Sequence, residues 1–289
     1  MKLVSTLSLI ILISINSLGQ DKAAYSLYDQ NGKKVKYSKM MKDIAGADVV
    51  LFGENHNNAL IHWLELQVTK SMYEQSNNLA LAAEMFEADD QLIIEEYLAG
   101  KYDHNIFSAE AKLWKNYTTD YKPLLDFAKT HNLPFVAANI PRRYARMVYK
   151  RGIESLDSLD NEAKKFIAPL PIEIDLSLPG YKNMIDNMGS HAPKGTIDNM
   201  AKAQASKDAT MAHFITRASA AGSRVIHYNG AYHSNNFDGI NHYLRAANPE
   251  IKIITISIAD QDDISELEEG MLNLANYIFA IPKDMTKTY

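Results

Sequence analysis

The sequence predicts an α/β fold: a parallel-centred sheet flanked by helices on both faces, with a small helical insertion lobe. Short apolar runs alternate with longer amphipathic stretches, and each run has the length of a buried strand. We expect strands at residues 48–52, 79–85, 134–138, 224–228, 251–258 and 277–281. Strands that alternate with helices pair in parallel and carry helices on both faces of the sheet.

The stretches between the predicted strands have the spacing of helices. Leu60, Leu64 and Val68 recur at helical intervals, Pro141 suits the first turn of a helix, and residues 200–220 are typical of one long helix. Residues 157–193 break this rhythm because prolines and glycines are frequent there, which predicts the insertion lobe. We therefore expect a single domain over residues 20–289.

Residues 1–19 have the features of a secretory signal peptide. Lys2 precedes an apolar stretch at 7–15, which is shorter than the roughly 20 residues of a membrane-spanning helix. Ser17 and Gly19 supply small residues before a cleavage site, which we place between Gly19 and Gln20. We expect an exported protein of the periplasm or cell envelope. An N-terminal membrane anchor is the alternative interpretation.

Composition excludes several classes of function. The chain has 289 residues, of which 46% are hydrophobic and 22% charged, which is typical of a globular protein. Its net charge of −5 argues against a nucleic-acid partner, because phosphate contact needs a basic surface. It has no cysteine, which excludes thiol catalysis, cysteine-ligated zinc, iron–sulfur clusters, disulfides and a lipid anchor on cysteine.

Four polar clusters directly follow four of the predicted strands. They contribute Glu54 and His56, then Glu84, then Arg142 and Arg143, and finally His233. The carboxyl ends of parallel strands share one edge of a sheet, and ligands bind there, so we expect these residues to line one crevice. Asp208 lies on the apolar face of its predicted helix and is expected to point inward as a supporting residue.

Each of these residues also has a structural explanation. Glu54 and His56 could belong to the loop that caps the next helix, and Glu84 could be a buried carboxylate with satisfied hydrogen bonds. The arginine pair could be solvated, although cations are disfavoured at a helix N-terminus unless an anion is near. His233 could be a core histidine, and Asp208 could lie at the fringe of its helix face.

The predicted lobe holds the candidates for binding haem iron. Tyr181 and His191 lie in an irregular segment together with Met184 and Met188. Tyrosine, histidine and methionine are all known axial ligands of haem. The alternative is an apolar lobe that only packs on the sheet.

The motifs as an ordered set resemble a known family. They are Gly53-Glu54-Asn55-His56, Glu84, Asn139-Ile140-Pro141-Arg142, Ala203-Gln204 with Asp208 and Met211-Ala212, and Gly230-Ala231-Tyr232-His233. This order resembles the ChaN family of bacterial haem-binding uptake proteins, within the larger TIKI and erythromycin-esterase-like superfamily. The resemblance extends from about residue 48 to 258 and implies the same parallel-centred α/β fold.

The resemblance implies a ligand and partners. ChaN-like proteins are exported and carry haem, often as a stacked pair between two protomers, so a homodimer and an outer-membrane uptake system are possible partners. The wider superfamily includes metal-dependent proteases and esterases that use the Glu, His and Gly-x-x-His positions. This chain lacks the lipidation cysteine of some members.

Three functions therefore compete. We favour haem binding for iron uptake without turnover, with Arg142 and Arg143 near the propionates and Tyr181 or His191 on the iron. The second is a metal-dependent hydrolase that places a divalent ion on Glu54, His56, Glu84 and His233. In that case His56 acts as general base, oriented by Glu54, Glu84 binds the metal or acts as acid, and Arg142 stabilises developing negative charge. The third is an exported module that binds another anionic ligand.

Overall fold

The computed structural model describes residues 22–188 and 194–289. The predicted signal peptide and His191 lie outside these ranges. Within them the strands form one sheet in the order β1-β7-β6-β2-β5-β3-β4. The strands are β1 (Ser26–Asp29), β2 (Val49–Glu54), β3 (Leu79–Glu87), β4 (Phe135–Asn139), β5 (Arg224–Gly230), β6 (Ile253–Gln261) and β7 (Tyr277–Pro282). All neighbouring pairs are parallel except β1 with β7.

The predicted parallel-centred sheet is confirmed, and the sequence missed one strand. β1 is a four-residue strand at the edge of the sheet, and it pairs antiparallel with β7. Its segment is too short and too mixed in polarity to stand out as an apolar run. β3 and β6 extend beyond their apolar runs, to Glu87 and Gln261, because the sheet continues through the polar residues at its edge.

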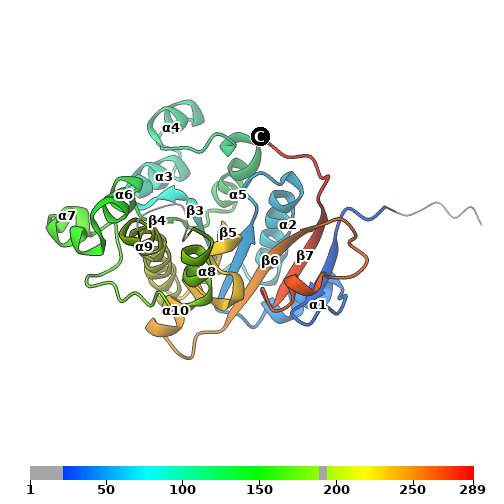
Figure 1. The fold of residues 1–289 in the computed structure, drawn as a ribbon. Helices are drawn as coiled ribbons and strands as arrows, with labels where there is room; N and C mark the ends of the chain where they lie inside the picture. The colour runs from blue at the N-terminus through cyan, green and yellow to red at the C-terminus, as the bar shows by residue number, and fades with distance from the viewer. Residues whose placement is uncertain (1–21, 189–193) are drawn as a thin grey trace, which may run out of the picture.

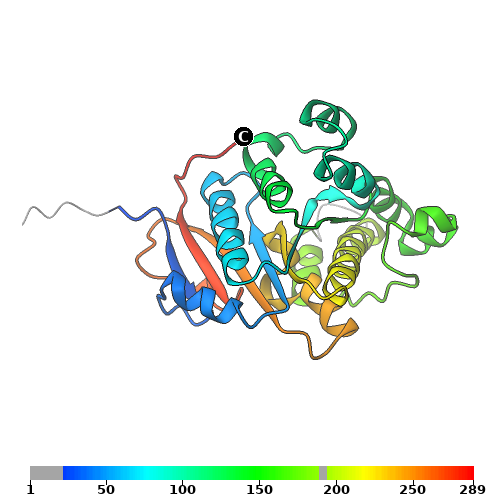
Figure 2. The ribbon, with the colours of Figure 1, turned by 180° about the vertical axis from the view of Figure 1, so that it is seen from behind.

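Helices cover both faces of the sheet, as Figures 1 and 2 show from opposite sides. They are α1 (Tyr37–Ile44), α2 (Ala59–Gln75), α3 (Gln91–Leu98), α4 (His104–Glu110), α5 (Lys122–His131), α6 (Arg142–Arg151), α7 (Asn161–Lys164), α8 (Pro179–Met188), α9 (Lys194–Ala220) and α10 (Ile240–Ala247). Side chains alternate along β2: Val50 and Phe52 pack with α1 and α2, whereas Val49 and Leu51 pack with α9 and α10. Each face therefore has its own apolar core.

The connection between α6 and α9 contains the segment expected to form an insertion lobe. It holds a 3-10 helix at Ile153–Ser158, then α7, an irregular stretch and α8. Tyr181 of α8 is buried against Ala201 and Ala205 of α9. The limits of the lobe and of the domain stay predictions.

No helix in the described part of the chain is both long enough and apolar enough to cross a membrane.

The core beside β7 provides a test of the fold. The Phe279 ring is fully buried, 6.2 Å from the Phe52 ring and 5.4 Å from the Tyr25 ring, measured between centroids. We expect Phe279→Ala to lower the free energy of unfolding by about 3–5 kcal/mol, because it removes buried area and leaves a cavity. Urea denaturation measures this. Leu92→Ala, at a side chain that is 65% exposed, is the control and should change stability by less than about 0.5 kcal/mol.

Candidate functional site

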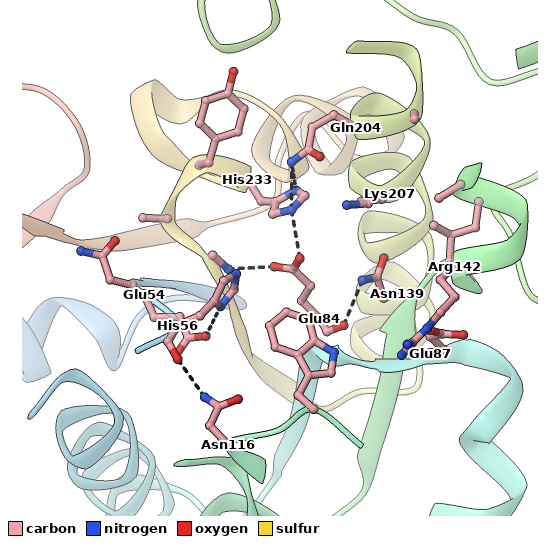
Figure 3. Close-up of a pocket in the computed structure, with 18 of the residues that line it drawn as sticks. Glu54, His56, Glu84, Glu87, Asn116, Asn139, Arg142, Gln204, Lys207 and His233 are labelled. Carbon is pink, nitrogen blue, oxygen red and sulfur yellow. Dashed lines mark hydrogen bonds and ion pairs between the residues drawn. The ribbon is translucent and has the colours of Figure 1, made fainter. Parts of the chain in front are cut away.

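A cavity of about 1360 Å³ opens at the carboxyl edge of the sheet, where β2, β3, β4 and β5 end. Five of the residues expected to share a crevice line it, as Figure 3 shows: Glu54, His56, Glu84, Arg142 and His233. They meet because each lies within or just after the carboxyl-terminal part of a parallel strand, and the carboxyl ends of those strands coincide. Small-molecule pockets commonly measure about 300–1,000 Å³, so this cavity is large for a single small ligand.

The end of β2 fixes His56 in the wall of the cavity. Glu54 is the last residue of β2, and its Oε1 lies 2.6 Å from His56 Nδ1 and accepts a hydrogen bond of 2.9 Å from the Tyr121 hydroxyl. The Asn116 amide donates to the backbone oxygen of His56 at 2.8 Å, and the Trp114 ring lies edge-on to the imidazole. His56 is therefore held through Nδ1, with Nε2 beside Gly230.

Electrostatics stabilise the charged forms of this pair. Burial alone raises the pKa of Glu54, but the hydrogen bond with His56 and the close contact with His62, together with the charges of both imidazoles, outweigh it and bring the pKa to about 2. Burial alone lowers the pKa of His56, but the hydrogen bond and the charge of Glu54 raise it above its ordinary value. Both shifts favour the ionised forms of Glu54 and His56.

Gly230 is required by the close approach of two side chains. A Cβ at this position would lie 2.8 Å from His56 Nε2 and 3.6 Å from Glu84 Oε2. The Gly230 amide also donates to Glu84 Oε2 at 2.8 Å. A larger residue would displace His56 or the Glu84 carboxylate, so the glycine of the Gly-x-x-His motif serves the packing of the site.

His233 bridges two buried carboxylates. Its Nδ1 is hydrogen-bonded to Asp208 Oδ1, and its Nε2 lies 3.1 Å from Glu84 Oε1. Burial alone lowers the pKa of His233, but the charges of Glu84 and Asp208 raise it to about 10. The same contact keeps the pKa of Glu84 well below its usual value, although burial opposes this. His233 therefore contacts a carboxylate through each imidazole nitrogen, and these two contacts favour its protonated form.

Asp208 is a supporting residue that lies behind the wall. It is 1% exposed and, besides His233, it accepts a hydrogen bond of 2.6 Å from the Tyr181 hydroxyl. Burial raises the pKa of Asp208 in spite of its contact with His233.

The arginines differ from one another in position. Arg142 lines the cavity and its Nε donates to Glu87, whereas Arg143 pairs with Asp89, stacks on the Tyr144 ring and is not part of the wall. Sequence reasoning missed Arg146 and Tyr149, which also line the cavity. They lie four and seven residues after Arg142 in α6, so they share its helix face. This helical spacing, counted from Pro141, is the signal that could have found them.

Of the two predicted iron ligands, Tyr181 is the one that the structure describes, and it does not line this wall. Tyr181 is 2% exposed and its hydroxyl is turned into the core toward Asp208, so the structure does not offer it to a ligand in the cavity. The tyrosine packs inward because its ring fills the space between α8 and α9. His191 lies outside the described residues. Met184 does line the cavity.

The predicted metal set forms a hydrogen-bonded and ion-paired network instead. Glu84 and His233 pair with each other, and Glu54 pairs with His56. Within residues 22–188 and 194–289, the potential metal ligands that gather are Glu54, His62 and Glu65, a buried group behind the wall. The ligand atoms of Glu54, His56, Glu84 and His233 are not gathered in this way, so the structure gives no support to a hydrolytic ion on these four residues.

Comparison with known proteins identifies the family. The family model for haem-binding uptake proteins of the Tiki superfamily, ChaN, matches residues 40–244. No curated protein matches the chain. A solved structure described as cofacial haem binding to ChaN of Campylobacter jejuni is 18% identical, with a TM-score of 0.66 over 88% of this chain and 96% of that one. A succinoglycan biosynthesis protein is 11% identical, with a TM-score of 0.54 over 91% and 95% of the two chains. The two structures share the fold, and the family match covers more than half of the sequence: the chain belongs to the haem-binding uptake family of the Tiki superfamily, ChaN.

Proposed function

We propose that this protein binds haem in the cavity at the carboxyl edge of the sheet and serves haem or iron uptake. The observation that carries the proposal is the cavity-facing side of α6, which presents Tyr149 one turn from Arg146 and two turns from Arg142. Membership of the haem-binding uptake family supports this ligand, as does the shared fold with a ChaN protein described as binding haem cofacially.

The wall supplies the contacts that haem needs. Haem is a flat apolar disc with two propionates, so it requires an apolar platform and cations at one edge. Leu113, Trp114, Ile140 and Met184 give the cavity its apolar surface. Arg146 and Lys207 stand at the wall without an ion pair to any described residue, so their charges are available to propionates.

Tyr149 is the proposed iron ligand. Tyr149, Tyr232 and Tyr289 line the cavity, but the Tyr232 hydroxyl is already bonded to the Gly180 carbonyl oxygen. Tyr289 is the last residue and 66% exposed, whereas Tyr149 is held on a helix and 42% exposed. A ligand on a rigid element is positioned more accurately than one on a free segment. Its hard phenolate oxygen favours ferric iron.

We also propose that the protein is exported and that it forms a homodimer. The features of residues 1–19 support export to the periplasm or cell envelope, without a lipid anchor. The large cavity and the cofacial haem described for the Campylobacter jejuni protein support a homodimer with a stacked haem pair between two copies. An outer-membrane uptake system is the proposed partner with which the exported protein exchanges haem.

The iron ligand is tested by hemin titration. We expect wild type to give a saturable shift of the Soret band. Tyr149→Phe should lose the phenolate-to-iron charge-transfer band and bind at least about tenfold more weakly, or about 1.4 kcal/mol. Tyr232→Phe is the matched control and should bind as wild type does. An unchanged spectrum in Tyr149→Phe would contradict the ligand, and no saturable shift in wild type would contradict haem binding itself.

The propionate contact is tested with a modified ligand. Arg146→Gln should weaken hemin binding by about three- to tenfold, because it removes a charge-assisted hydrogen bond from a partly exposed site. The same variant should leave the affinity for hemin dimethyl ester unchanged, because that ligand has no anionic edge. Fluorescence quenching measures both. Arg143→Gln, outside the wall, serves as the control. Equal losses for the two ligands would show that Arg146 acts through packing instead.

Export is tested at the N-terminus of the protein. Expressed in a bacterium, the chain should be recovered from the envelope fraction with a mature N-terminus at or within about two residues of Gln20. N-terminal sequencing measures this. A retained Met1 in membrane pellets would instead support the N-terminal anchor.

A further inference from the structure

A closed polar cluster lies behind the cavity wall, between the end of β2 and helix α2. It contains Glu54, His62, Glu65 and Asp120, which are 2%, 5%, 0% and 3% exposed. His62 and Glu65 lie three residues apart in α2, so they share the helix face that is turned toward β2. Such a concentration of buried titratable groups is costly unless the groups are paired or hold a cation.

The cluster is incompletely satisfied by the described residues. Neither oxygen of Glu65 has a hydrogen-bond partner among them. His62 Nε2 lies 2.5 Å from Glu54 Oε2, and His62 Nδ1 lies 3.3 Å from Asp120 Oδ2, but neither imidazole nitrogen has the geometry of a hydrogen bond. Buried polar atoms without partners are rare in proteins, and an unplaced ion is one explanation of them.

We propose that this cluster binds a divalent transition-metal ion through Glu54 Oε2, His62 Nε2 and the Glu65 carboxylate. The ligand atoms lie within 4.8 Å of one another, which suits a single shared ion. Two carboxylates balance the double charge, and an imidazole with carboxylates suits zinc, manganese or iron. Because the group is closed to solvent, the ion has a structural role.

The surroundings have the form of an outer ligand shell. A histidine that binds a metal through one nitrogen usually directs the other toward a carboxylate, and Asp120 has that position behind His62. Asp120 is itself fixed by hydrogen bonds from the Asn116 amide, at 2.6 Å, and the Thr288 hydroxyl, at 3.0 Å. The oxygen of Glu54 that faces away from the ion keeps its contacts with His56 and Tyr121. The ion would thus hold the residue that orients His56 in the cavity.

Binding requires one local movement. Glu54 Oε2 and His62 Nε2 lie 2.5 Å apart, which is closer than two ligands of one ion. Around an ion, each of these atoms would lie about 2.0–2.2 Å from the metal, so they must separate for the ion to enter. The competing explanation is that the cluster holds protons alone, and it predicts that no metal binds.

The test uses the full chain, stripped with a chelator, reloaded with Zn²⁺ and dialysed before elemental analysis. We expect wild type to retain one zinc per chain and to unfold at a higher temperature than the stripped protein, because an ion that binds only the folded state stabilises it. Glu65→Gln and His62→Gln should lose the zinc. His233→Gln, in the cavity wall and without a contact to the proposed ligands, is the matched control and should keep it.

Each outcome decides the proposal. Wild type that retains no zinc overturns it, and so does a Glu65→Gln variant that still holds the ion. X-ray absorption of the wild-type zinc complex decides without any variant, should the variants fail to fold. One imidazole bound to the zinc supports the proposed site, which contains His62 as its single histidine. Two imidazoles would identify His56 and His233 in the cavity and overturn the assignment. None of these results depends on haem binding.

Discussion

The buried carboxylate of Glu54 is the group on which the arrangement of the site depends. Its Oε1 contacts His56 and Tyr121, and its Oε2 faces His62. These partners come from the loop after β2, the π-helical turn Tyr117–Tyr121 and helix α2. A buried carboxylate that loses its partners costs several kcal/mol, so the three segments are held in register around one side chain. Glu54 thus contacts both His56 in the cavity wall and His62 in the interior of the protein.

A second buried group of three residues fixes the opposite part of the wall. Glu84 comes from β3, His233 follows β5, and Asp208 comes from α9. The imidazolium between the two acids balances part of their charge, so the floor of the cavity is less repulsive to an anion than two free carboxylates would be. The cations Arg146 and Lys207 stand at the wall beside it. The cavity therefore has partly neutralised acidic groups on one part of its wall and the cations Arg146 and Lys207 beside them. A ligand with an anionic edge requires such an arrangement.

The same geometry separates the two main interpretations of the motifs. A hydrolytic metal centre on the cavity residues would have to break the contacts of His233 with Glu84 and Asp208, and the ligand atoms of this set do not gather around one point. Haem binding as proposed makes no such demand on these residues, because its proposed contacts come from the apolar lining of the cavity and from α6. The motif residues thus shape the wall of the cavity. Arg146 and Tyr149, which are proposed to contact haem, lie further along α6, the helix that begins at the motif residue Arg142.

The sequence by itself determined the parallel sheet, its helices on both faces and the convergence of Glu54, His56, Glu84, Arg142 and His233. It could do so because hydrophobic periodicity is local and the carboxyl ends of parallel strands coincide by topology. Tertiary structure alone decided which side chains reach the cavity. Tyr181 and Tyr149 are the same kind of residue, yet one is 2% exposed and bonded to Asp208, and the other faces the cavity. The gathering of His62 and Glu65 beside Glu54 was likewise invisible in the sequence. Orientation and protonation depend on packing between segments far apart in the chain, and no local pattern records which neighbour each side chain meets.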